Sequence, residues 1–237
     1  MQEQKVGNKA DCFMIRKILR MILDKLGYEI TRKDSGGFYS SYLSKMCTPK
    51  TVFDVGVGCG TPELYGAYPG AKYFLVEPLE EFRGDLEKIS EMINCVICQK
   101  ALGDTKGIRE INIEADPQLS SFCDRPRIDI PSGKRTVEVT TLDAILRENP
   151  DIETPILLKV DVEGYELKVL KGAGQLLKLT DMVIVEVSVA KRFKNSSTLD
   201  EIIFFMKENG FAVFDFLTIC RDSGKAGANL VDIVFKK

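Results

Sequence analysis

The chain has 237 residues, a formal net charge of -2 and a pI near 5.5. This length suits one α/β domain with additions, and it is large enough to bury a core without disulfide or metal support. Because there is no basic excess, composition argues against a nucleic-acid partner.

Histidine is absent and cysteine occurs seven times. Any general base or metal ligand therefore has to be a carboxylate, a tyrosine, a lysine or a thiolate. The cysteines are scattered and residues 1–11 are polar, so we expect structural thiols in a cytoplasmic protein. Cys95 and Cys98 have the spacing of a redox or zinc pair, but their apolar run indicates a buried strand.

Residues 13–26 have the pattern of an amphipathic helix with basic exposed positions, and Gly27 is placed to end it. We expect this helix to belong to an N-terminal helical cap, residues 1–48, on a main domain of residues 49–237. Weak peripheral association with a membrane is the alternative, since no run is long enough to span a bilayer.

A glycine-rich loop follows the first strand expected in the main domain, at residues 51–55. It contains Gly56, Gly58 and Gly60, and Asp54 precedes it. The next expected strand, residues 73–77, ends in Glu77. Glycines allow a nucleoside to approach the backbone closely, and the acid can accept both ribose hydroxyls. The pattern favours S-adenosylmethionine over NAD, because Thr follows the loop where a dinucleotide fingerprint has its third glycine.

Strands and helices then alternate along the chain. We expect helices from residue 61 and at 79–92, a strand at 94–99, a helix at 142–147, a strand from 155, a helix at 165–170 and a strand at 181–187. A capping box opens a helix at Thr198 that Gly210 closes, and residues 211–216 and 230–235 indicate a terminal hairpin. This order predicts an α/β fold with a seven-stranded, mostly parallel, doubly wound sheet and a terminal antiparallel hairpin.

Residues 105–140 are too long for a single crossover helix. They contain two strand-like runs, 108–113 and 136–140, around a polar loop at 116–133. Long loops in compact domains are often binding lids. We therefore expect inserted strands and an acceptor lid.

The segment from Lys159 to Ala173, with Asp161-Val-Glu163-Gly164 at its start, is the most distinctive motif. Together with Phe53-Asp-Val-Gly, Val76-Glu-Pro, Ala101-Leu-Gly-Asp and Thr141-Leu-Asp, it resembles the FkbM family of S-adenosylmethionine-dependent methyltransferases. The resemblance covers residues 50–235 and implies a class I, Rossmann-like methyltransferase fold. It also implies O-methylation of a hydroxyl on a sugar, glycan or natural-product acceptor. The chain departs from the family at Gly58-Cys59.

Within that interpretation, Asp54 orients the methionine end of the donor, and the three glycines line it. Glu77 takes the ribose hydroxyls. Leu102 offers its backbone or an apolar face to adenine, and Asp104 accepts from the adenine amino group; the alternative for Asp104 is an acid that starts a loop.

The base is expected among Asp161 and Glu163, which follow the fourth strand of the main sheet beside the donor. Two alternatives stay open: these acids hold Mg²⁺, or Glu163 caps the following helix. Lys159 is expected to pair with a nearby carboxylate, and Glu186 is a weaker candidate for the pocket wall.

Three functional alternatives remain at this stage. One is methyl transfer to nitrogen or to a carboxylate of a small molecule, which needs no strong base. The second is a donor-binding domain without catalysis, and the third is the NAD site. The sequence leaves the oligomeric state and the identity of the acceptor open.

Overall fold

The protein is described here by a computed structural model that covers residues 37–125, 133–221 and 226–237. The helix expected at residues 13–26 lies outside the described residues, and so does most of the proposed N-terminal cap. None of the described helices is long and apolar enough to cross a membrane.

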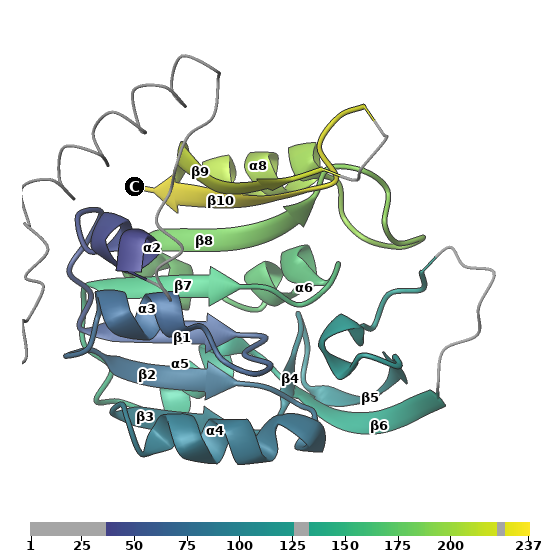
Figure 1. Cartoon of the computed structure of the whole chain (residues 1–237), viewed down its shortest axis with the longest axis horizontal. Helices are drawn as coiled ribbons and strands as arrows, with labels where there is room; N and C mark the ends of the chain where they lie inside the picture. The colour runs from purple at the N-terminus through teal and green to yellow at the C-terminus, as the bar shows by residue number, and fades with distance from the viewer. Residues whose placement is uncertain (1–36, 126–132, 222–225) are drawn as a thin grey trace, which may run out of the picture.

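The main sheet has seven strands in the order β3-β2-β1-β7-β8-β10-β9 (Figure 1). The strands are β1 (Thr51–Val55), β2 (Lys72–Val76), β3 (Cys95–Cys98), β7 (Ile156–Val160), β8 (Thr180–Ser188), β9 (Ala212–Cys220) and β10 (Leu230–Lys236). The first five in this spatial order pair in parallel, whereas β10 runs antiparallel to both β8 and β9. This topology confirms the class I, Rossmann-like methyltransferase fold with a terminal antiparallel hairpin.

Helices cover both faces of this sheet. One face carries α2 (Gly37–Leu43), α3 (Pro62–Ala67) and α4 (Arg83–Ser90), which follows the short 3₁₀ helix η1 (Glu80–Phe82). The other face carries α5 (Leu142–Glu148), α6 (Glu166–Lys171), α7 (Leu176–Leu179) and α8 (Leu199–Glu208). Figure 1 shows the first group in front of the sheet and the second behind it. The result is a three-layer α/β/α sandwich.

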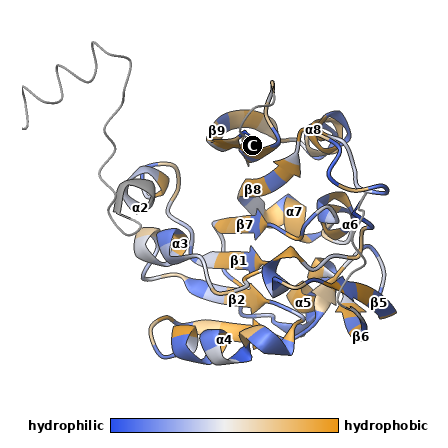
Figure 2. Ribbon diagram, turned by 45° about the vertical axis from the view of Figure 1, so that its right-hand side comes forward, coloured by the Kyte–Doolittle hydropathy of each residue, from blue (hydrophilic) through white to orange (hydrophobic). Residues whose placement is uncertain are grey.

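The core is built on the central strands, because they are covered on both sides. Every residue of β1 is buried. On one face Phe53 stacks on Phe74 with ring centroids 4.8 Å apart, and on the other Tyr65 meets Tyr73 edge-on at 5.4 Å. Burying each of these phenylalanines contributes about 1.5–3 kcal/mol. Figure 2 shows the outer helix α4 with both hydrophilic and hydrophobic residues, as its partly exposed position requires.

Side-chain caps begin two of the helices, and the cap of α8 is the one that the sequence predicts. In the capping box of α8, Thr198 and Glu201 each bond the other's backbone N–H. Thr141 accepts the N–H of Ala144 at the start of α5. Gly210, with a φ of +84°, follows α8 and allows the chain to turn back.

The insertion contributes two strands to a second sheet beside the carboxyl ends of the main strands. This sheet consists of β4 (Ala101–Leu102), which precedes the insertion, and of β5 (Gly107–Ile113) and β6 (Gly133–Thr140), in the order β4-β6-β5. The strand-like runs at 108–113 and 136–140 are thus confirmed as β5 and β6. The parallel pairing of β4 with β6 was not predicted, because Ala101–Leu102 is too short to show a strand pattern.

The strand predicted around Cys95 and Cys98 is confirmed, but the prediction that it is buried is wrong. These residues form β3, which lies at the edge of the sheet, and Val96 and Ile97 are exposed. Both cysteines are half-buried and free. An edge strand has a neighbour on one side only, so the apolar run fails to indicate complete burial here.

Candidate active site

A cavity of about 390 Å³ lies at the carboxyl ends of β1, β2, β7 and β8. This is where an open parallel sheet binds its ligands, and the volume is in the range of small-molecule sites. Seven of the residues expected in the site line the cavity: Gly56, Gly58, Gly60, Glu77, Leu102, Asp161 and Glu163. Asp54 and Asp104 lie outside its wall.

The glycine loop has the backbone conformation that the sequence requires. Gly56, Gly58 and Gly60 have φ values of +77°, +52° and +110°. Side chains other than glycine rarely adopt these angles. The loop is tied to the sheet where the N–H of Gly56 bonds the carbonyl of Val76 at 2.9 Å. A bare backbone surface therefore faces the cavity.

Glu77 is held rigidly in the cavity wall. One carboxylate oxygen accepts the N–H of Gly58 at 3.1 Å, and the other accepts the N–H of Leu79 at 2.9 Å. Burial raises the pKa of Glu77 to about 7, although the two N–H bonds act in the opposite direction. Each oxygen keeps further acceptor capacity, so the carboxylate can receive a pair of hydroxyls.

Asp54 lies behind the loop rather than in the cavity. It is completely buried, and its oxygens accept the hydroxyls of Tyr65 at 3.0 Å and Thr61 at 3.3 Å. Burial raises its pKa, opposed chiefly by the ammonium of Lys159, 3.6 Å away. In this arrangement Asp54 fixes the base of the loop. Its contact with the donor stays a prediction.

Lys159 lies between Asp54, behind the glycine loop, and Asp161 on the cavity wall. Its Nζ donates to Asp161 at 3.1 Å and lies near Asp54, which confirms the expected ion pair. Burial disfavours the ammonium charge, but the carboxylates of Asp161 and Asp54 outweigh this effect and raise the pKa of Lys159. The lysine therefore stays charged among acids.

Asp161 follows β7 directly, and its N–H bonds the carbonyl of Val55 at 3.0 Å. Its side chain is 30 % exposed, against 13 % for Glu163 and 17 % for Glu186. Of these three acids on the cavity wall, Asp161 is the most accessible to a bound acceptor.

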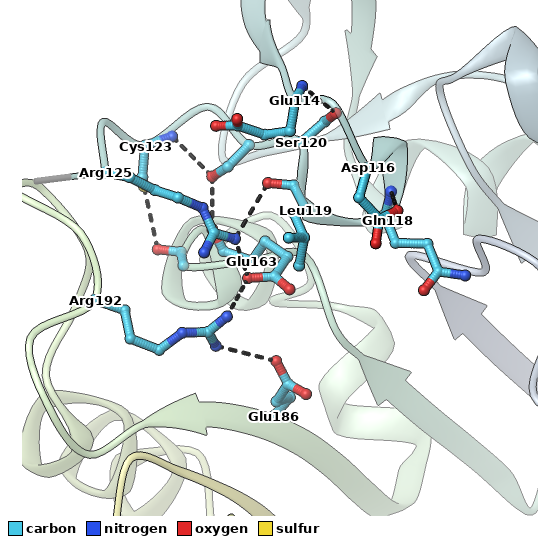
Figure 3. Close-up of polar contacts among 12 residues, drawn as sticks. Glu114, Asp116, Gln118, Leu119, Ser120, Cys123, Arg125, Glu163, Glu186 and Arg192 are labelled. Carbon is cyan, nitrogen blue, oxygen red and sulfur yellow. Dashed lines mark hydrogen bonds and ion pairs between the residues drawn. The ribbon is translucent and has the colours of Figure 1, made fainter. Parts of the chain in front are cut away.

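Glu163 is surrounded by positive charge (Figure 3). One of its oxygens accepts from Arg125 at 2.9 Å and from Arg192 at 2.8 Å. Burial raises its pKa, while the two guanidinium groups act to lower it. The alternative that Glu163 caps α6 is wrong: Tyr165 is the N-cap residue of that helix, no side-chain cap hydrogen bond is present there, and the Glu163 carboxylate bonds the two arginines instead.

Glu186, near the end of β8, also lines the cavity. Its carboxylate lies 3.6 Å from Arg192. Burial, together with the charges of Asp161 and Glu163, raises the pKa of Glu186 to about 9. A carboxyl group that keeps its proton can donate as well as accept hydrogen bonds.

The two residues expected near adenine are separated. Leu102 lines the cavity, but the carboxylate of Asp104 accepts from Lys168 at 2.7 Å and lies 3.8 Å from Arg109. The Lys168 hydrogen bond lowers the pKa of Asp104. Contact between Asp104 and adenine stays a prediction.

The expected carboxylates do not fit a Mg²⁺ site. No cluster of three or more potential metal ligands occurs among the described residues. Asp161 is bonded to Lys159, and Glu163 is bonded to two arginines. These cations already supply the positive charge that a metal would bring to the acids.

Several residues on the cavity wall were not singled out from the sequence. Gln118, Phe122 and Tyr165 line it, and the rings of Phe122 and Tyr165 lie 4.9 Å apart. The first two belong to the expected lid, whose internal pattern is too irregular to indicate which side chains face inward. Tyr165 was visible only as the start of a helix.

Comparison with known proteins places the chain among methyltransferases. The family model described as "Methyltransferase FkbM domain" matches residues 62–213. The hexuronic acid methyltransferase AglP of Haloferax volcanii is 25% identical over 169 residues, covering 68% of this chain and 69% of AglP.

Two solved structures match the chain with low similarity. The methyltransferase FkbM of Methylobacillus flagellatus has a TM-score of 0.47 and 16% identity, over 82% of this chain and 47% of that one. This chain therefore spans about half the length of that protein. The 1,6-didemethyltoxoflavin-N1-methyltransferase of Burkholderia thailandensis, solved with S-adenosylhomocysteine bound, has a TM-score of 0.46 and 12% identity, over 100% and 93% of the two chains. Since the family model matches more than half of the residues, the chain belongs to the FkbM family of methyltransferases.

Proposed function

We propose that the protein is an S-adenosylmethionine-dependent O-methyltransferase whose acceptor is a hydroxyl of a sugar, glycan or natural product. The observation that carries the donor assignment is the Glu77 carboxylate, held in the cavity wall by the N–H groups of Gly58 and Leu79. An acid so fixed beside a glycine loop suits the two hydroxyls of a ribose.

In this proposal the glycine loop and Glu77 hold the methionine and ribose parts of the donor, and Leu102 faces adenine. Asp54 acts from behind the loop through Thr61 and Tyr65. Asp104, which also accepts from Lys168, takes the adenine amino group. Bound S-adenosylmethionine supplies an electrophilic methyl group on a sulfonium.

Methyl transfer is an in-line displacement, so the acceptor oxygen has to lie opposite the departing sulfur. Holding the two reactants in that geometry lowers the activation barrier by roughly several kcal/mol. Asp161 is our candidate base, because it lines the cavity and is the most exposed of the three acids there. It takes the hydroxyl proton while Lys159 fixes its carboxylate.

The acceptor class rests on family membership and on the hexuronic acid methyltransferase AglP. A hexuronic acid carries hydroxyls and a carboxylate, so both a methyl ether and a methyl ester are possible products. We favour the hydroxyl, because Asp161 on the cavity wall can accept the proton that a hydroxyl has to lose, whereas a carboxylate acceptor needs no base.

The test is methyl transfer from donor labelled in its methyl group to a panel of neutral methyl glycosides, uronic acids and amino sugars. The proposal expects label on a neutral sugar, stable to mild alkali as a methyl ether. Label that alkali releases would identify a methyl ester. Label on the amino sugars alone would identify N-methylation, and binding of donor without transfer to any acceptor would favour the non-catalytic alternative.

A further inference from the structure

Glu163 lies where three segments meet beside the cavity (Figure 3). The first, which we call the lid segment, is residues 114–125 of the insertion. The second is the turn between β7 and α6, which contains Glu163, and the third is the loop between β8 and α8, which contains Arg192. The role of the cavity as an acceptor site rests on the proposed function, whereas the contacts of Glu163 do not depend on it.

The Glu163 carboxylate ties two of these segments to the third. The same oxygen accepts from Arg125 of the lid segment and from Arg192 of the β8–α8 loop, at 2.9 and 2.8 Å. All three side chains are at least four-fifths buried, with 13–16 % exposed. Charge-assisted bonds in such surroundings are strong, and removing one partner leaves a buried charge unpaired.

The backbone around Glu163 is arranged for the same contacts. Glu163 has a φ of +54°, which is unusual for a residue with a side chain and is sustained only by its surroundings. Its carbonyl accepts the hydroxyl of Ser121 at 2.5 Å, and the next carbonyl, of Gly164, accepts the thiol of Cys123 at 3.3 Å. The turn thus presents two carbonyls and a carboxylate to the lid segment.

Phe193 forms the floor under both arginines. The guanidinium carbons of Arg125 and Arg192 lie 4.7 and 5.4 Å from the centre of its ring, which is fully buried. Gly164 packs against the same ring, and only glycine fits there, because a Cβ at this position would lie 2.6 Å from the ring. Beside it, the N–H of Lys194 donates to the carbonyl of Asp124 at 2.8 Å.

The lid segment covers the cavity from one side to the other. Residues Pro117, Gln118, Leu119, Ser120, Ser121 and Phe122 all line the cavity. Near its start, Gln118 donates to the thiol of Cys59 in the glycine loop at 3.0 Å. Near its end, Arg125 bonds both Glu163 and the carbonyl of Leu119. Releasing the Glu163 carboxylate therefore removes the charged contacts at this end of the lid segment and leaves the weaker bonds of Ser121, Cys123 and Asp124 to hold it.

We propose that Glu163 is a positioning residue that holds the lid segment closed over the acceptor end of the cavity through Arg125 and Arg192. It is not the proton acceptor of the reaction, because taking up a proton would leave two largely buried guanidinium groups without their shared partner. Asp161, two residues earlier and more exposed, keeps that role.

The test is amide hydrogen exchange of the full chain, measured by mass spectrometry on peptides that cover residues 114–125. Glu163→Gln keeps the shape of the side chain and removes its charge. We expect exchange in the lid segment to accelerate about tenfold or more, while the amides of β1 and β7 exchange as before. Glu153→Gln is the matched control, because Glu153 pairs with Lys50 at 2.8 Å on the surface. It should leave the lid segment unchanged.

A second pair of variants distinguishes loss of the contacts between Glu163 and the two arginines from general destabilisation of the fold. Arg192→Met should reproduce the effect of Glu163→Gln, and Arg192→Lys should restore part of the protection, because it keeps the charge. Unchanged exchange in the lid segment of Glu163→Gln would overturn the proposal. Acceleration across the whole chain, or equal effects of Met and Lys at position 192, would also overturn it, since the role would then be structural only.

Calorimetric titration of S-adenosylhomocysteine into the same samples tests the proposed function separately from the role of Glu163. Glu163, Arg125 and Arg192 do not contact the glycine-loop residues that we assign to donor binding. The affinity of Glu163→Gln for S-adenosylhomocysteine should therefore stay within about threefold of that of the unaltered protein. Failure of the unaltered protein to bind would refute the donor assignment and leave the exchange result valid.

Discussion

The carbonyl oxygen of Asp161 lies 1.7 Å from the place where a Cβ on Gly56 would stand. The turn after β1 and the turn after β7 thus touch backbone to backbone, at the point where the donor loop meets the candidate base. A backbone carbonyl cannot rotate away as a side chain can. Gly56 also has a φ of +77°, so both space and conformation require glycine there.

Gly56→Ala should therefore destabilise the fold by about 1–3 kcal/mol or more, because the two turns have to separate. Urea unfolding followed by circular dichroism measures this. Gly84→Ala in α4 is the control: a Cβ there meets nothing within 4 Å, and the change should be neutral or stabilising by up to about 1 kcal/mol. Equal stability of the two variants would contradict the backbone contact.

The carboxylates beside the cavity should not bind Mg²⁺, since Lys159, Arg125 and Arg192 already neutralise them. Titration of millimolar MgCl₂ into the protein should produce no binding heat and no rise in melting temperature. Turnover, once an acceptor is found, should survive a chelator. Saturable Mg²⁺ binding that Asp161→Asn abolishes would restore the metal alternative.

Two buried acids and one largely buried acid should make the fold less stable as the pH rises. The pKa values of Glu77 and Glu166 are raised to about 7 and that of Glu186 to about 9, chiefly by burial. Each acid holds its proton more tightly in the folded chain than in the unfolded chain. Stability is therefore greatest below the unfolded pKa and is lost as pH rises through the folded pKa.

Thermal melts of the donor-free protein should show this as a melting temperature that falls between about pH 5 and pH 9. Glu186→Gln imitates the protonated acid, so it should flatten the decline at the alkaline end of that range. A melting temperature that rises steadily with pH would show that these acids are ionised at little cost in the folded chain.

Asp161→Asn keeps the shape of the side chain and removes the proton acceptor. With a hydroxyl acceptor, we expect turnover to fall by about 10²–10⁴ while donor affinity stays within a few-fold. Steady-state kinetics and calorimetry on the same sample measure both quantities. Near-normal turnover would move the base to another acid, with Glu186 the next to test, and lost donor binding would make Asp161 part of the donor site.

The sequence was sufficient for features that are local in the chain. The alternation of strands and helices predicts the sheet, and the spacing of Gly56, Gly58 and Gly60 before Glu77 predicts residues that all line one cavity. Parallel strands bring their carboxyl ends together regardless of what the side chains do later, so this part of the site follows from fold class.

The binding partners of individual acidic side chains could not be predicted, because these partners come from segments that are distant in the sequence. Asp104 turns to Lys168, which is 64 residues away. Glu163 binds Arg125 and Arg192, at separations of 38 and 29 residues. A pattern of acids at strand ends indicates a charged site, but it does not show which acids are neutralised by arginine or lysine.

The most direct test of the donor assignment is calorimetric titration of S-adenosylhomocysteine into the unaltered protein and into Glu77→Ala. We expect one site per chain, and Glu77→Ala should lose about 1.5–3 kcal/mol of binding free energy for each charge-assisted bond removed, while the protein stays folded. An unchanged dissociation constant in Glu77→Ala, or no binding to the folded unaltered protein, would contradict the account.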